Sequence, residues 1–172
     1  MTVRWEDDER LRPLLADGVD IWSRTTPLHV TGSALVVHPP TARVLLRWHE
    51  RYQLWNHVGG HVDEGEHGDP WRTALREATE ETGLTDLRPF PGPEPAVLLV
   101  RHVPVPAAKG EPDHEHADVC YVLATDTPEA TVDEHDDAAL RWVSVDEART
   151  LVNDHVREIV ERAAALLRPP GD

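Results

Sequence analysis

The sequence predicts an α/β domain whose layers include a mixed β-sheet. Extended apolar segments occur in both halves of the chain, and a helical segment at residues 70–82 separates them. An amphipathic pattern over residues 154–168 predicts a closing helix. A chain of 172 residues is long enough for one domain with a full hydrophobic core and short for two such domains. We therefore expect residues 1–172 to form a single domain.

The composition narrows the classes of function. A formal net charge of −15 argues against sequence-independent binding to nucleic acid and against binding to an anionic membrane. No apolar run approaches the roughly 20 residues of a membrane span, and the acidic N-terminus does not resemble a signal peptide. Cys120 is the only cysteine, which excludes an internal disulfide. We therefore expect a cytoplasmic protein.

The first third of the chain predicts a short helical extension followed by strands. Residues 1–24 form the extension, because leucines recur at helical spacing within residues 5–21. Residues 28–38 and 44–48 predict two strands of a hairpin, joined by the turn sequence "PPTAR". Residues 52–62 predict a short extended piece that contains paired glycines.

The central helix has a start signal and a stop signal. Asp69 is a typical N-cap, and Pro70 is favoured at the first helical position. Gly83 is typical of a helix end. These signals predict a helix over residues 70–82.

The second half of the chain predicts strands and then helices. Residues 96–103, 117–125 and 140–145 each predict a strand, and a polar, proline-containing loop separates the first two. A helix start follows the third of these strands, and residues 154–172 predict the C-terminal helix with a short tail.

The central helix gathers three glutamates opposite its apolar side. At about 100° per residue, the side expected to be buried holds Trp71, Ala74, Leu75, Ala78 and Thr82. Glu77, Glu80 and Glu81 fall on the other side, where like charges at this spacing repel. A solvated face is the ordinary reading of such a cluster. However, carboxylates beside a bare backbone at the paired glycines would also form a hard oxygen site for Mg²⁺ or Mn²⁺.

Residues 60–84, "GHVDEGEHGDPWRTALREATEETGL", resemble the signature box of the Nudix hydrolases. That box consists of Gly, five residues, Glu, seven residues, and then Arg-Glu-apolar-x-Glu-Glu-x-Gly-apolar. Every fixed residue type is present, but nine residues separate Glu66 from Arg76. The two additional residues lie before the start of the helix, so the spacing of the glutamates along the helix still matches the box. The longer spacer leaves open how Glu66 lies relative to Arg76. The resemblance extends over about residues 25–155.

The resemblance implies an α/β/α sandwich with a mixed β-sheet between helices, and it implies an activity. Nudix hydrolases cleave a diphosphate linkage in a nucleoside diphosphate joined to another group, and they use Mg²⁺, with Mn²⁺ also able to serve. Carried over to this chain, Glu80, Glu81 and the carbonyl of Gly59 are the expected metal ligands. Glu77 is expected to be a further ligand or the base that deprotonates water.

The resemblance also implies supporting residues. Arg76 is expected to orient the carboxylates, with Glu66 as its salt-bridge partner. Many members use one more acid before the final tryptophan-containing strand, and here Glu134, Asp136 and Asp137 are candidates. We favour Asp136 as a metal ligand, while a solvated acidic turn accounts for this segment equally well.

Several residues are candidates for binding the substrate. Trp48, Tyr52 and Trp55 lie along the approach to the glycines and could stack on a base, although core packing is the common role of each. His116 is a candidate for hydrogen bonding to phosphate. Lys109 could meet phosphate from its loop, although a solvated lysine is also compatible with that position.

The histidines allow a second kind of site. A transition-metal site built from His102, His114, His116 and Asp118 is conceivable, and roles in phosphate binding or in loop structure are the alternatives. The single cysteine gives no support to a thiolate-based zinc site.

Two other functions are compatible with the fold. One is an isomerase acting on isopentenyl diphosphate, which would need a cysteine near the strand before the box, whereas Cys120 lies in a later strand. The other is a non-catalytic domain that senses a nucleotide, which would usually show a degraded box. The sequence determines neither the nucleoside diphosphate derivative nor the oligomeric state, and a homodimer is compatible with it.

Overall fold

The structure is a computed structural model that describes residues 3–108, 110–133 and 139–168. The described strands are β1 (Leu28–His38), β2 (Arg43–His49), β3 (Leu54–Asn56), β4 (Val58–His61), β5 (Arg88–Pro89), β6 (Val97–Val105), β7 (His114–Ala124) and β8 (Leu140–Ser144). The described α-helices are α1 (Leu11–Ala16), α2 (Pro70–Thr82), α3 (Val145–Leu151) and α4 (Asp154–Leu167). The sequence predicted most of these elements, but it gave no sign of the short strand β5.

The strands form one mixed sheet in the described part of the chain. Its main path runs β3-β2-β1-β7-β5, while β4 pairs with β1, β6 with β7, and β8 with β2. The central pair of β1 and β7 is parallel, and the other pairs are antiparallel. β1 and β7 are buried along most of their lengths, as expected for strands covered on both faces.

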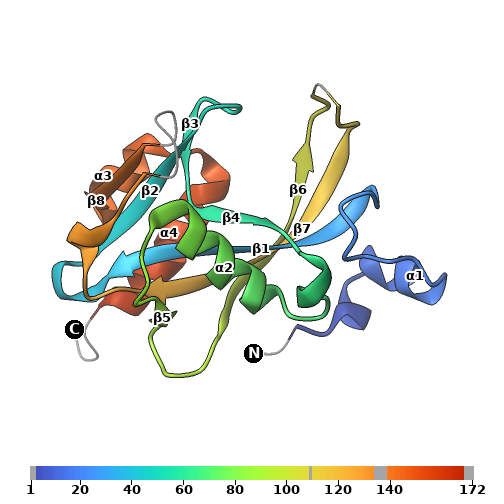
Figure 1. The fold of residues 1–172 in the computed structure, drawn as a ribbon, viewed down its shortest axis with the longest axis horizontal. Coiled ribbons are helices and arrows are strands. Elements are labelled where there is room, and N and C mark those ends of the chain that lie inside the picture. The colour runs from blue at the N-terminus through green and yellow to red at the C-terminus, as the bar shows by residue number, and fades with distance from the viewer. Residues whose placement is uncertain (1–2, 109, 134–138, 169–172) are drawn as a thin grey trace.

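Helices cover both faces of the sheet (Figure 1), and each face has its own hydrophobic core. Alternate residues of β1 serve the two cores: Ala34 and Val36 face the α2 side, and Leu35 and Val37 face the α3 and α4 side. The expected α/β/α sandwich with a mixed sheet is therefore confirmed.

The start and end of α2 follow the predicted signals. The Asp69 side chain accepts from the backbone N–H of Arg72, and Gly83 has a left-handed backbone at the C-cap. The first turn approaches β1 so closely that a Cβ at Gly32 would lie 2.4 Å from the carbonyl oxygen of Pro70. This contact fixes the height of α2 above the sheet.

The N-terminal segment packs beside β6 and β7 (Figure 1). Leu11 and Ile21 are fully buried in the core on the α2 side. His102 Nε2 of β6 lies 2.7 Å from Asp8 Oδ2. Arg10 Nη1 lies 2.5 Å from Glu115 Oε2 of β7. No helix in the described ranges is long and apolar enough to cross a membrane.

Candidate active site

Arg76 and Glu66 form a two-pronged salt bridge despite the longer spacer between them. Arg76 Nε donates to Glu66 Oε1 at 2.9 Å, and Nη2 donates to Oε2 at 3.2 Å. Thr73 and the backbone N–H of Asp63 also donate to Glu66. Burial alone would raise the pKa of Glu66, but the hydrogen bonds from Arg76 and Thr73 outweigh it and lower that pKa.

The longer spacer is absorbed before α2 begins. Residues Glu64–Glu66 form a single 3₁₀ turn closed by a capping box with Asp63. The N–H of Asp69 then donates to the carbonyl of Glu66 at 2.9 Å, which leads the chain directly into the helix cap. The two extra residues therefore leave the Glu66–Arg76 contact intact.

Arg76 also reaches two of the three helix glutamates. Its Nη1 donates to Glu77 Oε1 at 2.9 Å and to Glu80 Oε2 at 3.1 Å. Its Nη2 donates to the carbonyl of His61 at 2.9 Å, which connects α2 to the end of β4. A single guanidinium thus offsets the repulsion among carboxylates that the sequence places together.

Glu81 faces the paired glycines and a second arginine. Its Oε2 accepts from the backbone N–H of Gly59 at 3.0 Å. Its Oε1 lies 3.4 Å from Arg47 Nη1 of β2. The side chains of Glu77 and Glu81 are only 18% and 13% exposed, whereas that of Glu80 is 54% exposed. Of the three glutamates, Glu80 therefore lies on the open face of the helix.

Glu77 occupies the space that a side chain at Gly60 would need. A Cβ at Gly60 would lie 2.3 Å from Glu77 Oε1. Burial raises the pKa of Glu77, and the contact with Arg76 opposes that rise. The carboxylates and the adjacent backbone carbonyls are hard oxygen donors, so this donor set fits Mg²⁺ or Mn²⁺.

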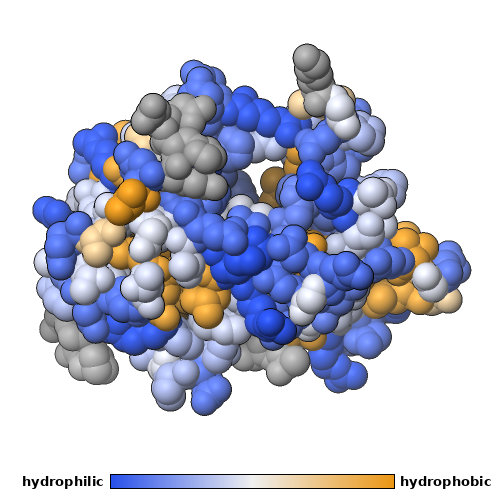
Figure 2. All heavy atoms as spheres, viewed as in Figure 1, coloured by the Kyte–Doolittle hydropathy of each residue, from blue (hydrophilic) through white to orange (hydrophobic). Residues whose placement is uncertain are grey.

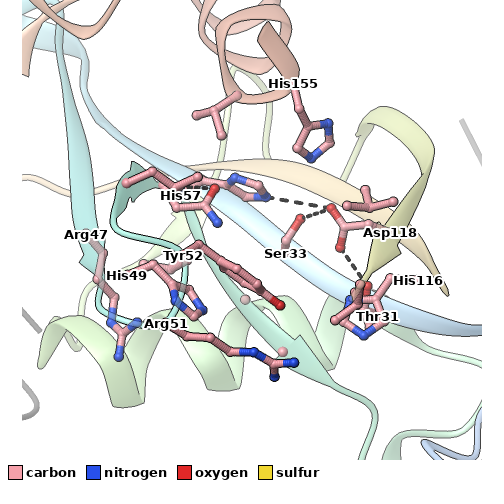
Figure 3. Close-up of a pocket in the computed structure, with 18 of the residues that line it drawn as sticks. Thr31, Ser33, Arg47, His49, Arg51, Tyr52, His57, His116, Asp118 and His155 are labelled. Atoms are coloured by element: carbon pink, nitrogen blue, oxygen red, sulfur yellow. Dashed lines mark hydrogen bonds and ion pairs between the residues drawn. The ribbon is translucent and has the colours of Figure 1, made fainter. Parts of the chain in front are cut away.

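A cavity of about 560 Å³ opens beside Glu81 and the paired glycines. Figure 2 shows a hollow between β3 and the β6–β7 hairpin. Side chains of Arg47, His49, Arg51 and Tyr52 line the cavity on the β2–β3 side (Figure 3). The volume lies within the range of about 300–1,000 Å³ that is usual for small-molecule sites.

A buried carboxylate lies on the β1–β7 wall of this cavity (Figure 3). Asp118 accepts from Thr31 Oγ1 at 2.8 Å and from Ser33 Oγ at 2.6 Å, and His57 Nε2 is 3.6 Å from its Oδ2. Burial alone would raise the pKa of Asp118, but His57 and the two hydroxyls outweigh it and lower that pKa. His155 of α4 completes this group, and burial lowers its pKa to about 4.

A second histidine group occupies the same wall nearer the N-terminal segment. His29, His61, His114 and His116 each offer one nitrogen, and these atoms all lie within 4.8 Å of one another. Burial lowers the pKa of His61 to about 4 and that of His116 to about 3, so both rings are neutral near pH 7.

At the mouth of the cavity, Glu111 joins two distant segments. Arg24 of the N-terminal segment donates to Glu111 Oε1 at 3.1 Å, and Arg51 donates to Oε2 at 2.9 Å. Arg51 also donates to the carbonyl of Pro106. These contacts hold the loop after β6 against the turn between β2 and β3.

Comparison with known families and structures identifies this arrangement. Residues 28–163 match the family model described as the NUDIX domain. The chain belongs to the Nudix family. Members of this family are pyrophosphohydrolases of nucleotide-linked substrates and typically use a divalent metal. A search of curated proteins found no match.

Solved structures with the Nudix fold agree with this assignment. A Caenorhabditis elegans Ap4A hydrolase in a binary complex has a TM-score of 0.61 and 19% identity, covering 80% of this chain and 96% of that one. The Escherichia coli dihydroneopterin triphosphate pyrophosphohydrolase has a TM-score of 0.58 and 20% identity, with 85% and 99% covered. The NUDIX domain of Shewanella oneidensis NrtR, complexed with ADP ribose, has a TM-score of 0.61 and 19% identity, with 91% and 98% covered. At these identities the likeness shows the fold alone.

The structure brings some of the expected Nudix substrate residues to the cavity and separates others. Tyr52 and His116 line it. Trp48 and Trp55 are direct partners across β2 and β3, so they share a face, and neither belongs to the cavity lining. Of the three rings that could stack on a base, only Tyr52 therefore lines this cavity. Trp55 packs instead against the core on the α3 and α4 side.

The other residues singled out in the sequence are the loop lysine, the downstream acids, the conceivable transition-metal set and the single cysteine. Lys109, Glu134, Asp136 and Asp137 lie outside the described residues. The structure divides the transition-metal set that the sequence made conceivable: His102 contacts Asp8, and Asp118 belongs to the group with His57 and His155. The buried Cys120 packs in the core on the α3 and α4 side, where burial raises the pKa of its thiol. This setting is unsuited to a nucleophile.

Sequence reasoning missed several cavity residues of this Nudix domain. Arg47, His49 and Asn56 were not singled out, although Arg47 and His49 alternate with Trp48 along a predicted strand. That alternation places the two polar side chains on one face of the sheet. Thr31 and Ser33 carry the same signal, because they flank Gly32 in an otherwise apolar strand.

Proposed function

We propose that this Nudix protein hydrolyses the diphosphate linkage of a nucleoside diphosphate joined to another group. The main support is the intact acid set of α2, braced by Arg76, directly beside a cavity large enough for a nucleotide. Glu81 belongs to both features, because it contacts Gly59 and lines the cavity. A diphosphate bound in the cavity would therefore lie next to the carboxylates.

In this proposal, Glu80, Glu81 and the carbonyl of Gly59 hold Mg²⁺ or Mn²⁺, and Asp136 is a further candidate ligand. When bound, the ion would neutralise phosphate charge and promote ionisation of the attacking water. Glu77 either completes the ligand set or accepts the proton from water. Arg76 and Glu66 have a positioning role, since their hydrogen bonds fix the carboxylates relative to β4.

The remaining cavity residues suit a nucleotide derivative. Arg47 and Arg51 bring two positive charges to one wall, which favours phosphate oxygens in a strongly acidic protein. Tyr52 is 37% exposed and offers an aromatic face to a base or sugar. His116 is the fourth proposed contact, through hydrogen bonding to phosphate.

The first prediction tests this function by turnover. The purified protein is incubated with Mg²⁺ or Mn²⁺ and a panel of nucleoside triphosphates, nucleotide sugars, ADP-ribose and dinucleoside polyphosphates, and the products are identified by mass. We expect nucleotide products from at least one compound. Glu81→Gln should lower kcat by roughly 100-fold or more with its circular dichroism unchanged.

The matched control is Glu64→Gln, because Glu64 is exposed in the 3₁₀ turn before α2 and outside the acid set. It should retain wild-type turnover. Binding of a nucleotide derivative without turnover of any compound would favour a sensor. Unchanged activity in Glu81→Gln would show that the acid assignment is wrong.

A further inference from the structure

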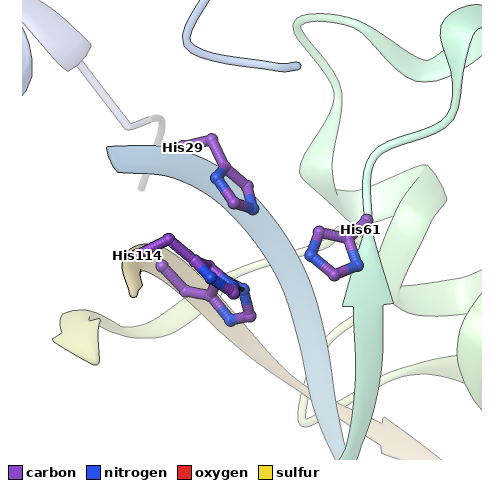
Figure 4. Close-up of side chains that lie close together, drawn as sticks. His29, His61 and His114 are labelled. Carbon is purple, nitrogen blue, oxygen red and sulfur yellow. Dashed lines mark hydrogen bonds between the residues drawn. The ribbon is translucent and has the colours of Figure 1, made fainter. Parts of the chain in front are cut away.

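The four-histidine group contains none of the glutamates of α2, although the backbone carbonyl of His61 accepts from Arg76. Of its side chains, only His116 has a role in the proposed hydrolysis, as a contact to phosphate. Its members come from three strands: His29 from β1, His61 from the end of β4, and His114 and His116 from the start of β7. Figure 4 shows His29, His61 and His114 turned toward one another. The ring centroids of His29 lie 5.0–5.4 Å from those of the other three.

Hydrogen bonds determine which nitrogen of His29 carries its proton. Nδ1 lies 2.7 Å from the carbonyl oxygen of Thr26. Since a carbonyl can only accept, Nδ1 must donate, and the neutral ring then has its lone pair on Nε2. That Nε2 is buried and has no hydrogen-bond partner, and His29 as a whole is 0% exposed. A buried lone pair without a partner is costly unless something occupies it.

His114 has the same tautomer as His29, but its Nε2 has a hydrogen-bond partner in His116. Its Nδ1 lies 2.9 Å from the carbonyl oxygen of Pro112, which again leaves the lone pair on Nε2. That Nε2 is 3.1 Å from His116 Nε2. Two nitrogens bound to one tetrahedral Zn²⁺ at about 2.0–2.1 Å would be roughly 3.3 Å apart. Backbone carbonyls behind the rings are also the usual partners of metal-binding histidines.

We propose that His29, His61, His114 and His116 bind one divalent transition-metal ion, separate from the carboxylate site. Four imidazole nitrogens suit Zn²⁺, Cu²⁺, Ni²⁺ or Co²⁺ and do not suit Mg²⁺, which prefers oxygen. We take Zn²⁺ as the reference ion because its tetrahedral preference matches four ligands. Such an ion would join β1, β4 and β7 at one wall of the cavity. The inference does not depend on the proposed hydrolysis.

The neighbouring group of His57, Asp118 and His155 is a weaker candidate for an ion. Arg101 Nη1 lies 3.0 Å from His155 Nδ1, so a permanent positive charge opposes a cation there. The oxygens of Asp118 already accept from Thr31 and Ser33. In the four-histidine group, no side chain forms a hydrogen bond to an arginine among the described residues. Arg24 acts on His29 and His61 only through its charge, and the Glu111 carboxylate opposes that effect.

The second prediction tests this site with zinc alone. The full chain is stripped of metal, and Zn²⁺ binding is measured by calorimetry and by metal analysis in millimolar Mg²⁺, which occupies oxygen sites. We expect one Zn²⁺ per chain. His114→Gln and His116→Gln should each weaken the affinity by about 100-fold. Zinc should also raise the melting temperature of the wild type and leave that of these variants nearly unchanged.

Two controls test whether the zinc is held by these four histidines. His67→Gln removes an exposed histidine outside the group and should bind zinc as the wild type does. Glu81→Gln should also keep its zinc, because the glutamates are not ligands of this ion. Equal affinity in the wild type and in His114→Gln would overturn the proposal, and so would loss of zinc from Glu81→Gln. His114 begins β7, whereas His116 lies opposite the buried His29, so His114→Gln remains informative if His116→Gln fails to fold.

Discussion

At the scale of single residues, the absence of a side chain at Gly60 shapes the candidate site. Glu77 lies against the bare backbone there, and a Cβ would come within 2.3 Å of its carboxylate oxygen. The sequence placed carboxylates beside the bare backbone of the paired glycines as a candidate oxygen site for a metal ion. The structure adds which carboxylate meets which glycine, since Glu77 lies against Gly60 and Glu81 accepts from Gly59, a distinction that spacing alone could not make.

The third prediction follows from this contact. Gly60→Ala should displace Glu77 and lower turnover by roughly 10- to 100-fold, since supporting contacts of metal sites contribute effects of this size. Gly65→Ala is the matched control, because a Cβ there meets nothing within 4 Å. Steady-state kinetics of both variants provides the measurement. If both variants were equally active, the contact with Glu77 would have no catalytic importance.

The fourth prediction concerns His155, whose pKa falls to about 4 mainly because of burial, with His57 and Arg101 adding to the shift. An unfolded histidine titrates near pH 6.5, so the unfolded state binds more protons between about pH 6.5 and 4. The free energy of unfolding therefore decreases as the pH falls through this window. Above pH 7, His155 is neutral in both states and does not change that free energy. Asp118 and Glu158, the nearby carboxylates, partly oppose the shift.

His155→Gln should remove this penalty. Relative to the wild type, the variant should gain up to about 2 kcal/mol in free energy of unfolding between pH 7.5 and pH 5. Urea unfolding at the two pH values measures the difference, with His67→Gln as a control that should follow the wild type. A constant difference between wild type and His155→Gln at both pH values would contradict the assignment.

At the scale of elements, α2 illustrates what periodicity can and cannot predict. Its bounds were predictable from Asp69, Pro70 and Gly83, because caps act locally. The apolar side was also predicted in outline, although Thr73 is fully buried and Trp71 only partly. The glutamate side was predicted as one face, whereas β4 covers Glu77 and Glu81 and leaves Glu80 exposed. Only the tertiary position of β4 makes that distinction.

The fifth prediction uses this difference between the glutamates. Ionised Glu77 is disfavoured by burial, which raises its pKa, so its charge lowers the stability of the metal-free fold at neutral pH. Glu77→Gln should therefore raise the free energy of unfolding by up to about 1 kcal/mol without metal, and it should reduce the stabilisation by Mg²⁺.

Thermal unfolding with and without Mg²⁺ provides the measurement. Glu80→Gln is the comparison, because the exposed Glu80 should affect metal-free stability little. A metal-free Glu77→Gln variant less stable than the wild type would mean that its contact with Arg76 outweighs the cost of burial.

At the scale of the whole molecule, the sheet topology brings together the four-histidine group, which the sequence alone could not predict. His29 and His116 are direct partners across the parallel pair of β1 and β7, and His61 faces Thr31 across β1 and β4. His29 and His116, which are almost ninety positions apart in the sequence, thus become neighbours through the register of β1 and β7. Sequence reasoning placed His114 and His116 together by their spacing, but it added His102, which the antiparallel pairing of β6 directs to the N-terminal segment.

The contacts of Glu111 with Arg24 and Arg51 have a consequence for how the cavity responds to its solvent. Both salt bridges are substantially exposed, with side-chain exposures of 34–63%, so each adds little to the stability of the fold. Exposed ion pairs weaken as ionic strength rises, because screening acts over about 8 Å in physiological salt. The mouth of the cavity is therefore held by contacts that dissolved salt weakens, while the buried contacts of β1 and β7 behind it are screened much less.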